Sequence, residues 1–147
     1  MNTETNKLVT RRFIEEVVNT GNVERLADFI SPDWRESNDR TGQTAGLDSV
    51  RAHVLGVRQT FPDLHLTVEQ QIAEGDWVAT RITAHATHLG WWLGIKPTGR
   101  RVAITGVNLD RVVNGRIVEH GGAANMFEAL LSIDAVRVVG GSQEGAV

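Results

Sequence analysis

Four runs of strand-like residues fill the second half of this chain, and they constrain its fold more than any other feature. Each run is rich in β-branched residues, and apolar and polar positions alternate along it. The runs are residues 65–73, 77–88, 101–113 and 116–124. Between them lie the turn-forming sequences Glu74-Gly75, Pro97-Thr98-Gly99 and Asn114-Gly115. These joints are too short for crossover helices, so the sequence predicts an antiparallel meander.

The first half of the chain has the 3.6-residue period of amphipathic helices. We expect helices over 9–18, over 23–30 with an end at Ser31-Pro32, and over 47–61, with a last short helix over 126–133. Helices followed by a meander predict an α+β domain, in which the curved sheet wraps over the helices and encloses a cone-shaped cavity. One domain is expected over residues 1–139, and the Gly-rich residues 140–147 are expected to form a disordered tail.

Composition excludes several classes of function. The 147 residues include 15 Lys and Arg against 18 Asp and Glu, and the resulting net charge of −3 gives no electrostatic reason to bind nucleic acid or an anionic membrane. The absence of Cys and Tyr excludes disulfides, thiolate metal sites, cysteine nucleophiles and phenol chemistry. His85 and His88 point to opposite faces of one predicted strand, so we expect no metal site. No signal-peptide or membrane-spanning run is present, which favours the cytoplasm.

The last predicted hairpin gathers the most reactive set of side chains. If 113–115 form a three-residue turn, Asn108 pairs with His120, and Asp110 shares their face of the sheet. A two-residue turn would pair Leu109 with His120 and separate the cluster. The register of this hairpin therefore decides whether the cluster exists.

Such a cluster suits the removal of a proton next to a carbonyl group. The reaction needs a base with a pKa near the working pH and a donor for the enolate oxygen. Asp110 is a usable base because an apolar pocket raises the pKa of a carboxyl group, His120 can act as base or donor, and Asn108 can donate to the enolate. The alternative is that Asp110 pairs with an arginine, such as Arg111 or Arg81, at the rim of the sheet.

Two further polar residues are candidates for the site. His65 begins a predicted strand and is a second catalytic candidate, although the alternate face of that strand is polar. Its neighbour Asp63 is expected to be a turn residue after Pro62. Arg81 can orient an oxyanion or an ester by charged hydrogen bonds, or it can form a structural ion pair.

Aromatic residues are the candidates for substrate contacts. Trp91 and Trp92 lie in an apolar loop flanked by glycines, which is either a pocket lip that stacks on a flat molecule or a contact of the core or of a dimer. Trp34 and Phe61 are further candidate walls of the pocket. One face of the run 77–88 consists mainly of small residues, which suits packing against helices or against a second subunit, so we expect a homodimer through sheet faces.

Five segments carry a resemblance to a known family. They are residues 11–22 (RRFIEEVVNTGN), 60–69 (TFPDLHLTVE), 76–90 (DWVATRITAHATHLG), 97–111 (PTGRRVAITGVNLDR) and 114–120 (NGRIVEH). Together they resemble the SnoaL-like polyketide cyclases of the nuclear-transport-factor-like superfamily, over about residues 8–135. The resemblance implies a cone-shaped α+β barrel with an apolar pocket, and tailoring of an aromatic polyketide without a metal or an organic cofactor. Relatives either close rings by an aldol reaction or, in the AclR-like branch, hydroxylate anthracycline-type precursors.

The chain departs from this family at one position that matters. Cyclases of the group carry an aspartate two positions after the histidine, in the sequence EHWD, whereas this chain has Gly121 and Gly122 after His120. The family base therefore cannot be carried over. We expect hydroxylation, with a possible partner reductase, and keep aldol ring closure as the alternative. A non-catalytic module that binds a hydrophobic ligand is the second alternative.

Overall fold

The computed structural model describes residues 2–140, so most of the expected tail lies outside the described residues. The elements are α1 (Thr3–Phe13), a π-helical turn η1 (Ile14–Val18), a 3₁₀ turn η2 (Val23–Arg25), α2 (Leu26–Phe29), β1 (Ile30–Glu36), α3 (Gly46–Thr60), β2 (His65–Glu74), β3 (Trp77–Thr87), β4 (Arg101–Val113), β5 (Arg116–Asn125) and α4 (Phe127–Ser132). The predicted helices and the four predicted strands are all present, within a few residues of their expected ends at most positions. The strand β1 was not predicted.

The sheet has the order β1-β5-β4-β3-β2. The meander β2–β5 is antiparallel, as predicted, but β1 pairs with β5 in parallel. Ser31-Pro32 indicated the end of a helix, whereas Pro32 lies inside an edge strand, where a missing N–H can be tolerated. The predicted α+β fold, with helices packed in a curved sheet, is therefore confirmed. Two details differ from the prediction, because the sheet is mixed and its two edges do not meet.

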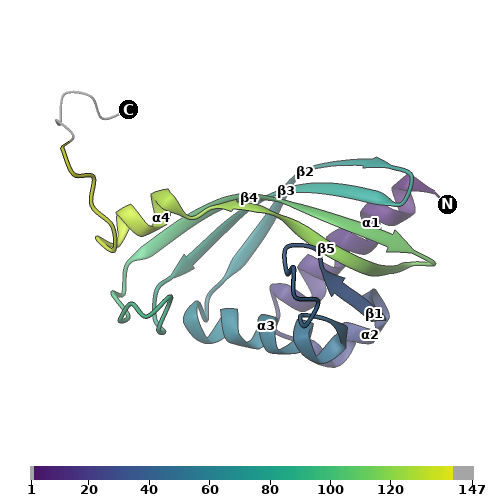
Figure 1. The fold of residues 1–147 in the computed structure, drawn as a ribbon, viewed down its shortest axis with the longest axis horizontal. Coiled ribbons are helices and arrows are strands. Elements are labelled where there is room, and N and C mark those ends of the chain that lie inside the picture. The colour runs from purple at the N-terminus through teal and green to yellow at the C-terminus, as the bar shows by residue number, and fades with distance from the viewer. Residues whose placement is uncertain (1, 141–147) are drawn as a thin grey trace.

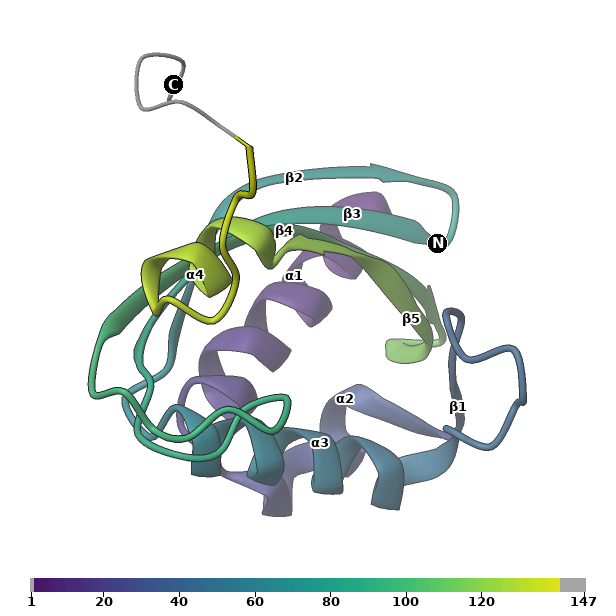
Figure 2. The same cartoon turned by 60° about the vertical axis from the view of Figure 1, so that its left-hand side comes forward.

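The sheet arches over the helices, so its inner face is the face turned toward α1 and α3 (Figures 1 and 2). The small residues of β3 lie on this inner face and are buried. Helix α1 packs against β2 and β3 there, and Gln71 donates to the Thr10 hydroxyl at 2.9 Å. Helices thus cover the small-residue face, and the predicted dimer stays a prediction.

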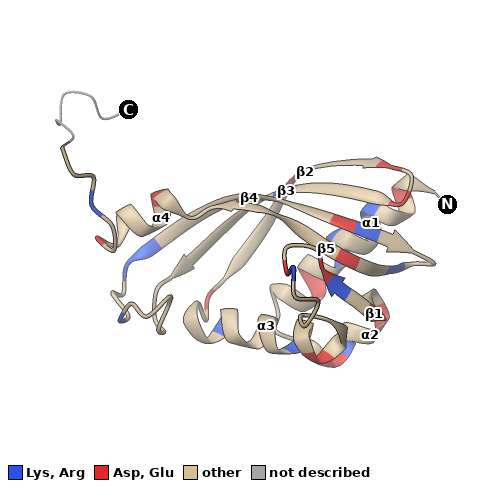
Figure 3. Ribbon diagram, in the orientation of Figure 1, with Lys and Arg blue, Asp and Glu red and all other residues tan. Residues whose placement is uncertain are grey.

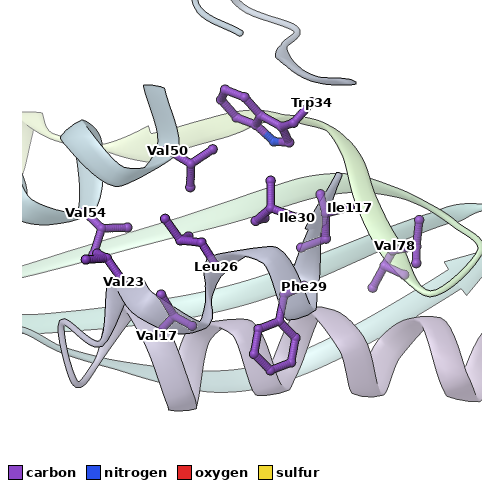
Figure 4. Close-up of a cluster of buried hydrophobic side chains, with 11 residues drawn as sticks. Val17, Val23, Leu26, Phe29, Ile30, Trp34, Val50, Val54, Val78 and Ile117 are labelled. Atoms are coloured by element: carbon purple, nitrogen blue, oxygen red, sulfur yellow. The ribbon is translucent and has the colours of Figure 1, made fainter. Parts of the chain in front are cut away.

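Two groups of buried side chains hold the layers together. The first lies between α2, α3 and the β1–β5 half of the sheet and includes Leu26, Ile30, Trp34 and Ile117 (Figure 4). The second lies at the other end of the sheet, around Phe61 and the segment that includes α4. Burial of such apolar surface is the main stabilising contribution to a domain of this size. The open part of the inner face lies along β4 and β5.

Charged side chains of both signs are interspersed along α1, β1 and the nearby end of β5 (Figure 3). This mixture agrees with the small net charge of the chain. Within residues 2–140, no helix is long and apolar enough to cross a membrane.

Candidate active site

The hairpin of β4 and β5 brings Asp110 and His120 together by a route that the sequence did not predict. Its turn has two residues, Asn114 and Gly115, both with positive φ (50° and 76°), and not three. This turn alone would place Leu109 opposite His120. A bulge between Arg111 and Val112 shifts the register by one residue, so Asp110 lies directly opposite His120.

The Asp110 carboxylate and the His120 imidazole form a short contact. The Nδ1 atom of His120 lies 2.6 Å from Oδ1 of Asp110. Because a carboxylate only accepts hydrogen bonds, Nδ1 carries the proton, and Nε2 is left for another partner. The Asp110 side chain is 5% exposed and that of His120 is 34% exposed. The carboxylate is thus held inside the protein while the imidazole reaches solvent.

The environment of His120 stabilises its protonated form. Burial lowers the pKa of His120, but the hydrogen bond and the charge of Asp110, with a smaller effect of Glu36, outweigh burial and raise the pKa above the ordinary value of 6.5. Glu36 is the register partner of His120 across β1 and β5. The expected alternative, in which Asp110 pairs with an arginine, is not what the structure has, because Arg111 lies on the other face and contacts Asp76 at 3.6 Å.

A second imidazole, His53 of α3, belongs to the same neighbourhood and was missed in the sequence. The surrounding protein atoms lower the pKa of His53, the charge of His120 lowers it further, and the charge of Glu36 opposes both. His53 was overlooked because it interrupts an apolar helical pattern, and Glu36 because β1 was not predicted. A histidine three residues after the buried Val50 was the available signal.

Gly122 explains why the family aspartate has no counterpart here. Its φ is +124°, and a Cβ atom at this position would lie 2.1 Å from the carbonyl oxygen of Val107. No side chain fits that backbone. The loop after β1 also covers this part of β5, where the Asn38 amide donates to the Gly122 carbonyl at 3.0 Å. The departure from the EHWD pattern is therefore built into the conformation of β5.

The inner face of the sheet next to the pair is open. Asn108 is partly exposed, and Gly122 and Ala124 on the neighbouring strand are exposed, although all three lie on the face that is buried along β3. A groove of about 710 Å³ lies elsewhere, beside Trp77 and Arg111, and another of about 340 Å³ lies beside α1. Neither groove is lined by Asp110 or His120. The enclosed apolar pocket stays a prediction, and the pair is reached from an open face.

The structure keeps one of the other polar candidates beside this pair and separates two from it. Asn108 is opposite Gly122, one inward-facing pair along the hairpin from Asp110 and His120, so it shares their face. His65 pairs with His85 at the start of β2 and is exposed on the outer face of the sheet. Arg81 is also exposed on that outer face. Of the predicted polar residues, the structure brings together Asp110 and His120, with Asn108 beside them.

Some of the aromatic candidates are buried in the core, and one is exposed to solvent. Trp34 and Phe61 are buried in the two core groups, and Trp92 packs edge-on against Phe61 with ring centroids 5.2 Å apart. His88, fully buried beside them, anchors the base of the loop through a Thr98 contact of 3.0 Å at Nδ1. Trp91, the neighbouring residue in this loop, is 62% exposed. The tryptophan pair therefore combines one core contact with one exposed side chain.

Among residues 2–140, no group of three or more His, Cys, Asp or Glu side chains is arranged to hold a metal ion. The fold and the pair together define a small α+β protein with a carboxylate–imidazole pair on the inner face of an arched sheet. A carboxylate–imidazole pair has the chemistry of a proton donor or acceptor.

Comparison with known proteins identifies the family. The model of the SnoaL-like polyketide cyclase family matches residues 8–132, and the chain belongs to this family. It is 30% identical to the aklanonic acid methyl ester cyclase AcmA of Streptomyces galilaeus over 75% of this chain and 77% of that protein. It is 32% identical to the nogalonic acid methyl ester cyclase of Streptomyces nogalater over 69% and 78% of the two chains. The crystal structure of AclR, a putative hydroxylase from Streptomyces galilaeus, superposes with a TM-score of 0.80 at 31% identity, over 94% of this chain and 86% of AclR.

Proposed function

We propose that this protein tailors an aromatic polyketide of the anthracycline type, and that it does so by hydroxylating a polycyclic intermediate after removal of an acidic C–H proton. The observation that carries this proposal is the contact of Asp110 with Nδ1 of His120, which leaves Nε2 available at the open inner face. The similarity to cyclases of methyl esters of polyketide acids and to AclR supports the class of substrate.

The first step needs no more than these side chains and a suitable substrate. A C–H bond next to a carbonyl breaks, its electron pair moves toward the carbonyl oxygen, and the proton goes to a base. Asp110 holds the imidazole of His120 in one orientation, so that Nε2 can take a proton or donate one to the oxygen. Asn108 lies close enough along the strand to add a second donor on the same face.

Hydroxylation then requires dioxygen and two electrons. A hydroquinone form of the substrate supplies both electrons, so that hydroquinone and dioxygen give a hydroxyquinone and water, with one oxygen atom in each product. A partner reductase would produce that hydroquinone. Gly122 supports this outcome because the backbone has no room for the aspartate on which the cyclases rely by family resemblance.

Ring closure is the second candidate, and the names of the curated relatives favour it. In that reaction the same carbanion attacks a carbonyl group within the substrate, a C–C bond forms, and the new alkoxide takes up a proton. The mass is unchanged, or falls by one water if dehydration follows.

The test is incubation of the protein with a tricyclic polyketide methyl ester that carries an enolisable side chain. Parallel samples contain air, argon or ¹⁸O₂, each with and without a chemical reductant that generates the hydroquinone. Mass spectrometry reports hydroxylation as a gain of one oxygen in air, heavy in ¹⁸O₂, and ring closure as an unchanged or water-depleted product that also forms under argon. Binding without any product would favour the ligand-binding module. Turnover that survives in both His120→Ala and Asp110→Asn would overturn the assignment of the site.

A further inference from the structure

Helix α3 carries a second imidazole, His53, and this helix packs next to the strands that hold the Asp110–His120 pair. Val50 is buried in the first core group and Val57 packs against the second, so both mark the inward side of α3. His53 is three residues after Val50 and four before Val57, which puts it beside this inward side, at an exposed position of the helix. Helix α3 packs against β1, and β1 pairs with β5. His53, Glu36 and His120 therefore follow one another across three neighbouring elements.

We propose that His53 is the catalytic base of this site and that His120, held by Asp110, is the donor to the developing enolate oxygen. This assignment rests on the proposed function and divides its first step between two named groups. The C–H bond breaks, its proton moves to a ring nitrogen of His53, and the electron pair moves onto the carbonyl oxygen. The Nε2–H of His120 donates to that oxygen.

The charges around each imidazole fit this division of roles. Asp110 from β4 and Glu36 from β1 lie near His120, and these two carboxylates favour its protonated form. His53 faces His120 and Glu36, and the surrounding protein and the cation of His120 favour its neutral form. Two groups whose environments shift their pKa values in opposite directions are the arrangement that separates a base from an acid at one pH. At a pH between the pKa of His53 and the pKa of His120, His53 is neutral and can accept a proton, while His120 is protonated and can donate a hydrogen bond.

The arrangement also explains why Gly122 is tolerated. A carboxylate at the family position would serve as base from β5, but this chain has no side chain there. The base is then supplied from α3, on the opposite wall. His53 reaches the surface, so it can exchange its proton with solvent after each turnover.

The first experiment does not depend on any substrate. The ring resonances of the five histidines are titrated by NMR and assigned with single His→Gln variants. We expect a pKa below 6.5 for His53 and above 6.5 for His120. In His120→Gln, the pKa of His53 should rise because the neighbouring cation is gone. A His53 titration that does not move in His120→Gln would overturn the proposal.

The second experiment measures kcat against pH on the substrate found above. His53→Gln should lower kcat by about 10²-fold or more, which is the usual contribution of a general base, and should remove the limb of the profile on the acidic side. His85→Gln, which alters an exposed imidazole on the outer face, is the matched control and should leave kcat and the profile unchanged. A His53→Gln enzyme that keeps its rate and its acidic limb would overturn the base assignment while the proposed function stands. If no polyketide substrate is converted, the proposed function is wrong and the role of His53 as base is wrong with it. The NMR titration would still report whether the two imidazoles face each other.

Discussion

Replacing Asp110 with asparagine isolates the charge in the Asp110–His120 contact. The variant keeps the size of the side chain and an oxygen that can accept from Nδ1 of His120, but it removes the negative charge. A hydrogen bond to a charged group contributes about 1.5–3 kcal/mol. Because 34% of the His120 side chain is exposed, solvent screening favours the lower part of that range, about 1.5–2 kcal/mol. For a chain of this length this corresponds to a fall in Tm of roughly 3–8 °C.

The loss of unfolding free energy in Asp110→Asn should be larger at low pH than at high pH. The folded protein raises the pKa of His120, so the stabilisation from its charge is complete below the ordinary value of 6.5 and disappears as the pH rises through the raised value. Urea unfolding of the wild type and Asp110→Asn at about pH 6 and about pH 9 should therefore show a larger difference at the lower pH.

The control for this prediction is Asp76→Asn. Asp76 pairs with Arg111 at 3.6 Å on the outer face, and the loss should be below about 1 kcal/mol and nearly the same at both pH values. If Asp110→Asn lowers the free energy of unfolding equally at the two pH values, the reasoning is refuted, because the charge of His120 would then contribute nothing to the stability of the contact.

Three further changes test the surrounding structure. Gly122→Ala should destabilise the protein by more than about 3 kcal/mol in urea unfolding, because the new methyl group would lie 2.1 Å from a carbonyl oxygen. The control is Gly56→Ala, in the middle of α3 with open space around it, which should stabilise the protein by about 0.5–1 kcal/mol. Equal effects of the two substitutions would contradict this explanation of Gly122. Asp63→Asn should lower the stability of the protein near neutral pH, because two hydrogen bonds from Thr87 lower the pKa of Asp63. In the wild type this stabilisation should fade as acid protonates the carboxyl group of Asp63. A Tm that changes identically with pH in the wild type and the variant would contradict this prediction. Trp91→Ser should leave Tm within about 1 °C because the residue is 62% exposed, so any larger fall would show that this side chain packs against the protein.

The periodicity of the sequence predicted most of the fold. Alternation over the four runs gave the strands of the meander, and the small residues of β3 gave its buried face, because these patterns report which side of an element meets the core. The strand β1 was missed because Pro32 is unfavourable in most strands, and only pairing with β5 makes it one. An edge strand of this kind is defined by its neighbour more than by its own residues.

The candidate site was also only partly predictable from the sequence. The sequence by itself brought Asp110 and His120 into one hairpin and showed that the aspartate of the EHWD pattern is absent. Only the tertiary structure decided that they face each other. Relative to a three-residue turn, the two-residue turn and the bulge each move the register by one residue in the same direction, which returns both side chains to one face, and neither is visible in the pattern of apolar residues. It also decided that α3, which carries His53, packs against β1, the strand next to β5, because that packing joins residues that are far apart in the chain and no local periodicity records it.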